Sequence, residues 1–248
     1  MNLRRLLALP PKDPDLPGAG WLFLCSLSLF FVAQSVLASL FGVGGKGAEP
    51  NVPLQVRLIC GAWLVASLPI LAGAFLARGG AASLGIGPGK LRLRALAGGA
   101  AIFLAGLLFW FPLFTAYFQL LHALGVPRTP QPVYRWIAGN LAGPRPDWVL
   151  LFLVIFLLPF FEELAFRGLI QSWLRAHLPR GWALVLTAVL FGLAHEPWIM
   201  KFPVFLLGLF FGYARERTGS LWASWTAHVL HNGLAVVLVS HLIRFYDG

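Results

Sequence analysis

The stretch "LLPFFEELAFRGL", Leu157–Leu169, places two adjacent acids, Glu162 and Glu163, and one arginine, Arg167, inside an apolar run. The residues just before it, 148–156, are all apolar and are typical of a helix that faces lipid. A charged side chain at bilayer depth costs roughly 2.5–3.5 kcal/mol on insertion scales. Three such side chains in one span need a compensating reason.

Helix geometry supplies part of that reason. Glu163 and Arg167 are at i and i+4 on one face, with the acid N-terminal, which is the favourable order for an ion pair. Glu162 points about 100° to the side of Glu163, away from that pair. We therefore expect Glu163 and Arg167 to form a structural pair and Glu162 to be left free as a general base.

The composition indicates an integral membrane protein. Of 248 residues, 58% are hydrophobic and 11% are charged, whereas a soluble domain has about 25% charged residues. Several apolar runs also exceed the roughly 18 residues that a bilayer crossing needs. The net charge of +10 comes from Lys and Arg placed singly or in small groups between these runs. Such charges are typical of topology signals and lipid contacts, and they do not indicate nucleic-acid binding.

Apolar runs separated by Gly, Pro and charged residues predict seven spans. They lie near 21–43, 56–77, 95–124, 148–166, 181–197, 202–214 and 220–243. The third run contains Pro112 and is long, so an eighth crossing remains open. The sixth is short, and Pro197 and Pro203 lie on either side of its start, so it predicts a broken or re-entrant helix. The predicted fold is an all-α polytopic membrane helix bundle, with about 7–8 transmembrane helices and an intramembrane cavity.

One membrane domain accounts for the chain. We expect a cytoplasmic N-terminal lead-in at 1–20, N-terminal transmembrane helices and loops at 21–147, and a catalytic core at 148–248. The loop 125–147 is the longest polar segment, and its Pro and Gly content predicts an extramembrane cap. No cleavable signal peptide is evident.

The distribution of Lys and Arg predicts the orientation. With the N-terminus inside, cytoplasmic segments hold eleven of these residues, Arg175 and Arg215 among them, and the opposite side holds seven. This excess favours an N-terminus inside the cell. A composition rich in Ala, Gly, Leu and Arg, with four Lys, predicts a prokaryotic cytoplasmic membrane.

Two later motifs also place polar groups in apolar helices. In "VLFGLAHEPW", Phe191 and His195 are at i and i+4 and share a face. In "SWTAHVLHNGLA", one polar stripe about 100° wide runs along the helix. Its members are Ser224, His228, His231 and Asn232. A single stripe of this kind faces protein or water, not lipid, so we place the functional site in the C-terminal half.

The order EExxxR, FxxxH and HxxxN on successive apolar helices resembles the CPBP family of intramembrane proteases. That family contains the type II CAAX prenyl endopeptidases and the bacterial Abi, or bacteriocin-immunity, proteins. The resemblance covers about 148–243. It implies that Glu162 and His195 activate the water that attacks the scissile amide. It also implies that His228 and Asn232 stabilise the oxyanion or bind a metal. We expect the other residues of the predicted site to support these four; they are Glu163, Arg167, Phe191 and His231.

The sequence leaves a metal open. Glu162, His195 and His228 would suit a three-ligand zinc site with one position for water. Asn is a poor zinc ligand, however, and a glutamate base needs no metal. The zincin pattern HExxH fails, because Ile199 stands where the second His after His195 is required. Zinc is permitted by the sequence and not required by it.

The predicted function is that of an intramembrane endopeptidase whose partners are membrane lipids and a peptide or lipidated protein substrate. A C-terminal CaaX-type tail is one such substrate, and a small membrane peptide is another. A non-catalytic immunity or peptide-binding protein using the same cavity is the alternative. A proton or solute transporter is a third hypothesis, because intramembrane acids and histidines are typical of transporters. The absence of an inverted repeat in the sequence argues against it.

Overall fold

The computed structural model describes residues 19–41, 51–76, 80–87, 89–126 and 132–247. Within these ranges the chain is helical and contains no strand. The helices long and apolar enough to cross a membrane are Gly20–Leu40, Val52–Leu76, Leu93–Ala123, Trp148–His177 and Trp198–Thr218. The prediction of a helical membrane bundle is confirmed. The predicted N-terminal lead-in lies almost wholly outside the described residues.

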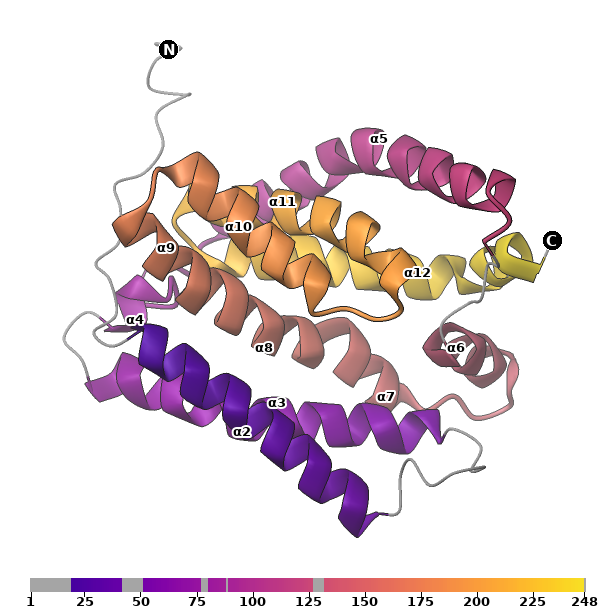
Figure 1. Cartoon of the computed structure of the whole chain (residues 1–248), viewed down its shortest axis with the longest axis horizontal. Helices are drawn as coiled ribbons and strands as arrows, with labels where there is room; N and C mark the ends of the chain where they lie inside the picture. Colours follow the sequence, from indigo (N-terminus) through magenta and orange to yellow (C-terminus); the bar gives the residue numbers. More distant parts are fainter. Residues whose placement is uncertain (1–18, 42–50, 77–79, 88, 127–131, 248) are drawn as a thin grey trace.

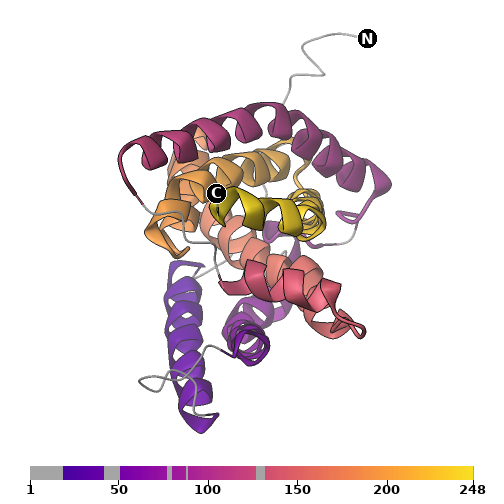
Figure 2. The ribbon, with the colours of Figure 1, turned by 90° about the vertical axis from the view of Figure 1, so that its right-hand side faces the viewer.

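The first two helices form a hairpin at one side of the bundle. Helices α2 (Ala19–Leu40) and α3 (Val52–Leu76) lie side by side, below the other helices in both views (Figures 1 and 2). Only 6% of the apolar window of α2 is buried inside the protein. An apolar helix with so little protein around it suits a lipid environment.

Helix α5 (Leu93–Ala123) is one continuous helix that passes over α11 (Lys201–Thr218) and α12 (Leu221–Asp247) (Figure 1). Pro112 lies within it and does not divide it, so the third run gives no eighth crossing. Glycines let α5 approach its neighbours closely. A Cβ at Gly99 would collide with the Ala223 carbonyl, and one at Gly106 would lie 3.1 Å from the Phe210 ring.

The central helix runs from Trp148 to His177. It consists of α7 (Trp148–Phe152), η1 (Leu153–Leu157), α8 (Leu158–Glu163), η2 (Leu164–Ile170) and α9 (Gln171–His177). Both η1 and η2 are π-helical, a geometry that occurs most often at functional sites. The predicted end of this span at 166 is wrong. The helix continues because Arg167, Gln171 and Arg175 are buried against protein instead of reaching water.

The remaining elements are short. Helix α4 (Gly80–Ser83) precedes α5, and α6 (Pro132–Ala142) occupies the segment predicted as a polar loop. Helix α10 (Arg180–Leu193) ends four residues before Pro197, and a single 3-10 turn, η3 (Trp198–Met200), leads into α11. The sixth apolar run is therefore an unbroken helix of 18 residues, and the irregular backbone lies before it.

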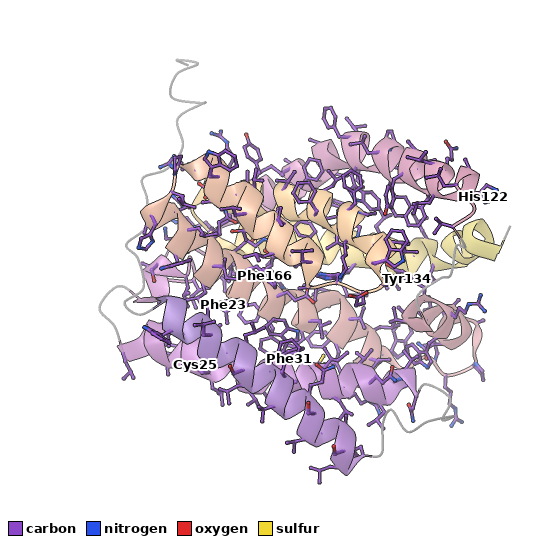
Figure 3. All side chains as sticks on the ribbon, viewed as in Figure 1. Phe23, Cys25, Phe31, His122, Tyr134 and Phe166 are labelled. Carbon is purple, nitrogen blue, oxygen red and sulfur yellow. The ribbon has the colours of Figure 1, made fainter. Side chains whose placement is uncertain are left out.

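The core lies where the central helix meets α10, α11 and α12. Leu164, Phe191 and Phe211 are almost completely buried there. Phe166 belongs to the same cluster and lies inside the bundle in Figure 3, whereas His122 lies near the far end of α5. The polar residues of the three sequence motifs are thus carried by helices that share one core.

Buried charges change the count of topology signals. Arg175 is 4% exposed and Arg215 is fully buried, so neither lies in a cytoplasmic loop as predicted. Without them the count is nine residues against seven. A charge that is enclosed by protein is not a loop charge of the kind that sets topology. An N-terminus inside the cell therefore stays a prediction with less support.

Candidate active site

The predicted ion pair between Glu163 and Arg167 is present. Arg167 Nη1 donates to Glu163 Oε1 at 3.0 Å, and both side chains are fully buried. Arg167 Nη2 also donates to the carbonyl of Gly208 on α11, at 3.2 Å. The pair therefore closes one turn of the central helix and ties that turn to α11.

Aromatic rings surround the guanidinium of Arg167. Its Cζ atom lies 4.1 Å from the ring centroid of Phe191 and 5.5 Å from that of Phe211. A cation held over aromatic faces away from water gains about 2 kcal/mol or more. Phe191, the first residue of the FxxxH motif, therefore stabilises the arginine of the EExxxR motif.

His228 on α12 lies between the two glutamates. Its Nδ1 is 2.9 Å from Glu163 Oε1, and its Nε2 is 3.7 Å from Glu162 Oε2. A carboxylate accepts hydrogen bonds, so Nδ1 donates and Nε2 is the nitrogen that faces Glu162. The Phe211 ring stacks on the imidazole at 4.5 Å and fixes its plane. Glu163 thus has two partners, and the sequence analysis gave it only Arg167.

The two adjacent glutamates differ in exposure. The Glu163 side chain is fully buried, whereas that of Glu162 is 13% exposed. Glu162 is the carboxylate that water can reach, and Glu163 is enclosed by its cation and imidazole. Exposure to water therefore distinguishes the two glutamates, and their division into catalyst and scaffold stays a prediction.

His195 lies just beyond the end of α10 and is half-buried. Its Nδ1 is 2.7 Å from the carbonyl oxygen of Phe191. A carbonyl can only accept, so Nδ1 carries the hydrogen and Nε2 is left for other partners. The Phe191 ring is 4.6 Å from the His195 ring and 5.9 Å from the His228 ring. Phe191 therefore contacts both imidazoles.

Asn232 binds the π-helical turn of the central helix. Its Nδ2 donates to the Val154 carbonyl at 3.0 Å, and Trp225 Nε1 donates to the Phe156 carbonyl at the same distance. Both carbonyls belong to η1. One N–H of the Asn232 amide remains beyond this bond. The sequence gave no signal for Trp225, because its partner is backbone on a distant helix.

His231 and Ser224 complete the stripe on α12. The His231 ring lies 5.2 Å from the Trp110 ring, on α5, and 6.3 Å from that of Phe211. Ser224 donates to the carbonyl of Leu221 on its own helix. His231 thus packs against rings of α5 and α11, and Ser224 bonds within α12, so the stripe is divided between the site and its surroundings.

A comparison with protein families matches part of the chain to a known family. The family described as "Type II CAAX prenyl endopeptidase Rce1-like" matches residues 144–234. The match covers 91 of the 248 residues, and we call this segment the Rce1-like domain after the family that it is similar to. The match agrees with the resemblance to the CPBP family. Comparisons with curated proteins and with solved structures find no match.

The Rce1-like domain contains the four predicted catalytic residues. Its bounds take in the central helix, α10, α11 and the first half of α12, and they leave the α2–α3 hairpin and α5 outside. The N-terminal helices thus pack around a domain that holds the whole candidate site.

The arrangement of donors does not support the zinc alternative. Among the described residues, no three His, Cys, Asp or Glu side chains are grouped as metal ligands. Glu162 and His228 are close to each other, but His195 does not complete a set of three with them. We therefore derive the chemistry from the side chains alone.

The Rce1-like domain also holds a second buried polar cluster, which the sequence analysis missed. Gln171 Nε2 donates to Glu216 Oε1 at 2.9 Å, and Arg175 Nε lies 3.1 Å from the same oxygen. Arg215 Nη2 donates to the Ser83 carbonyl at 3.2 Å. A signal was available in the spacing, since Gln171 and Arg175 follow Arg167 by four and eight residues on one helix face.

Proposed function

We propose that the protein is an endopeptidase that hydrolyses a peptide bond at the membrane with water activated by Glu162 and His195. The observation that carries the proposal is the position of Glu162. Its carboxylate is partly exposed, lies 3.7 Å from His228 Nε2, and directly precedes the helix turn that the buried Glu163–Arg167 pair holds. A base must be held in place and still reach water, and Glu162 meets both conditions.

The proposed reaction begins with a water molecule between Glu162 and His195. Glu162 takes one proton from the water as its oxygen attacks the carbonyl carbon of the scissile amide. His195 orients the same water through Nε2, since its Nδ1 is engaged by the Phe191 carbonyl. When the tetrahedral intermediate collapses, the C–N bond breaks and Glu162 passes its proton to the leaving nitrogen. The products are a carboxylic acid and an amine.

His228 and Asn232 would stabilise the negative charge on the carbonyl oxygen. Asn232 retains one amide N–H beyond its bond to Val154, and His228 donates through Nε2 when that atom carries a proton. In a site that excludes water, such donors each contribute about 3–4 kcal/mol to transition-state stabilisation. Both sit on α12, one helix turn apart, so they move as one unit.

The proposed substrate is the C-terminal tail of a membrane-bound protein or a small membrane peptide. The family description supports a CAAX-type prenylated tail. The apolar exterior of the helices supports a substrate that arrives from the lipid. The high content of Ala, Gly, Leu and Arg predicts a prokaryotic source, and in a prokaryote a membrane peptide is the expected target in place of a prenylated tail.

The test is proteolysis by the purified protein in lipid vesicles. The probes are a farnesylated peptide ending in CaaX, the same peptide without the lipid, and an apolar membrane-spanning peptide, with products identified by mass spectrometry. Cleavage by the wild type that is lost in Glu162→Ala and in His195→Ala supports the proposal. Cleavage that persists undiminished in Glu162→Ala would overturn it.

Two further arms separate the alternatives. Wild-type protein treated with a chelator should cleave as fast as untreated protein if the side chains suffice. Loss of cleavage after chelation and its recovery with Zn²⁺ would instead support the zinc alternative. A protein that cleaves none of the probes, yet protects cells equally well with and without Glu162→Ala, would be the non-catalytic immunity or binding protein.

A further inference from the structure

We infer that Lys201 is a positioning residue for His195, a role outside the three motifs and outside the groups that touch water or substrate in the proposed reaction. Lys201 is the first residue of α11, and His195 lies in the bend between α10 and α11. The inference rests on the proposed function, because it assigns His195 a water to orient.

The ammonium group of Lys201 is fully committed. Its Nζ donates to the carbonyls of Leu193 at 3.0 Å and His195 at 3.1 Å, and to Glu196 Oε1 at 2.7 Å. An ammonium has three N–H donors, and three acceptors surround this one. Lys201 is therefore not available to bind a substrate carboxylate, and its contacts all serve the segment that carries His195.

The bonds fall where the backbone of α10 lacks partners. The last carbonyls of a helix receive no hydrogen bond from an N–H of the same helix, and Leu193 is the final residue of α10. A cation at the C-terminal end of a helix is also favoured by the helix dipole. Lys201 therefore satisfies the end of α10 and fixes the backbone of His195 in the same contact.

Two independent bonds thus hold His195. Its ring is held by the Phe191 carbonyl through Nδ1, and its backbone carbonyl is held by Lys201. If either bond is lost, Nε2 can shift relative to Glu162 while the helices stay in place. A displacement of about 1 Å at a catalytic group is enough to lower a rate by about 10²-fold.

Close backbone packing at the same bend makes this contact short and rigid. A Cβ at Gly192 would lie 2.6 Å from the Lys201 carbonyl and 3.0 Å from the Phe205 Cβ. The end of α10 therefore touches the start of α11 directly. Lys201 reaches back over only six residues to His195, with little slack in the chain between them.

The experiment compares three variants of the full-length protein in lipid vesicles. Lys201→Met keeps the length of the side chain and removes its donors, and Lys201→Arg keeps a cation. Glu196→Gln is the matched control, since it alters the side-chain acceptor of Lys201 and leaves both carbonyl bonds in place. We expect Lys201→Met to lower kcat by about 10–100-fold with KM within about twofold. Lys201→Arg should recover most of that loss, and Glu196→Gln should stay within about twofold of wild type.

A double-substitution test distinguishes positioning from a general effect on folding. If Lys201 acts through His195, Lys201→Met should have no further effect on the residual activity of His195→Gln. The inference would be overturned if the losses in kcat from the two substitutions were additive. It would also be overturned if Lys201→Met lowered both kcat and the melting temperature and Lys201→Arg recovered neither.

A second readout does not depend on proteolysis. The ¹⁵N spectrum of labelled histidine should show a change at the His195 ring in Lys201→Met and none in Glu196→Gln. If the wild-type protein shows no protease activity but the His195 spectrum still changes in Lys201→Met, the proposed function is contradicted and the positioning role stands. An unchanged His195 spectrum in Lys201→Met would contradict the positioning role itself.

Discussion

Two buried charge clusters include residues of the central helix, and only one of them has the features of an active site. The first centres on Glu163, Arg167 and His228, and the second on Gln171, Arg175 and Glu216. Both link the central helix to α11, and both consist of nearly fully buried side chains. Buried charge alone therefore does not mark the functional site in this protein.

What separates the clusters is the presence of a partly exposed group beside the buried ones. Glu162, at 13% exposure, and the half-buried His195 border the first cluster. The acid of the second cluster, Glu216, is buried between Arg175 and Gln171. A carboxylate that acts as a general base in this protein therefore needs both a fixed scaffold beside it and access to water.

The largest effect expected is on catalysis, at the exposed acid of the first cluster. Glu162→Gln should lower kcat by about 10³-fold or more, because it removes the proposed general base without changing the shape of the side chain. Thermal unfolding in detergent should shift little, since Glu162 is partly exposed and the buried Arg167 pairs with Glu163 instead. Initial rates of peptide cleavage and a melting curve on the same preparation measure both.

The buried acid of the same cluster should behave in the opposite way. Glu163→Gln leaves Arg167 buried without its counter-ion, which should destabilise the fold by about 3–5 kcal/mol. The kcat of the protein that remains folded should fall by less than in Glu162→Gln. Equal loss of chemistry from folded protein in the two variants would contradict the division between catalyst and scaffold.

The second cluster supplies the matched control for stability without catalysis. Glu216→Gln should destabilise the protein by about 3 kcal/mol, because Arg175 loses its buried partner while the new amide still accepts from Gln171. The kcat per folded molecule should remain within about twofold of wild type. A large fall in kcat with an unchanged melting temperature would show that the second cluster also takes part in the reaction.

The smallest effects concern the two donors to η1. Trp225→Phe removes one hydrogen bond and should cost about 1 kcal/mol of stability, with kcat reduced less than about fivefold. Asn232→Ala removes the same kind of bond and also the N–H offered to the oxyanion, so kcat should fall by about 10²-fold. Equal effects of the two substitutions on kcat would reduce Asn232 to a residue that only holds the π-helical turn.

Much of the site could be predicted from the sequence because its spacing is local. The Glu163–Arg167 pair follows from i and i+4 geometry, and the Phe191–His195 contact follows from the same period. The long apolar runs required helices that satisfy their own backbone in lipid, so the fold class followed from composition and run length.

The predictions that failed concern contacts between distant segments. The central helix was expected to end at 166, and Arg175 and Arg215 were expected in cytoplasmic loops. Nothing near these residues in the chain reveals that Glu216 and Ser83 lie against them. The polar loop 125–147 likewise contains α6, whose apolar residues pack on α7 and α12.

The sequence by itself determined that the chain folds into membrane helices and that the polar groups of the three motifs lie within them. Backbone hydrogen bonding within a helix and the cost of exposing polar groups to lipid are set by residues close together in the chain. Only the tertiary structure decided how those groups pair. It placed His228 between the two glutamates, Asn232 on the Val154 carbonyl and Lys201 on the carbonyl of His195. These contacts join residues on different helices or across a bend, and helix packing alone brings them within hydrogen-bonding distance.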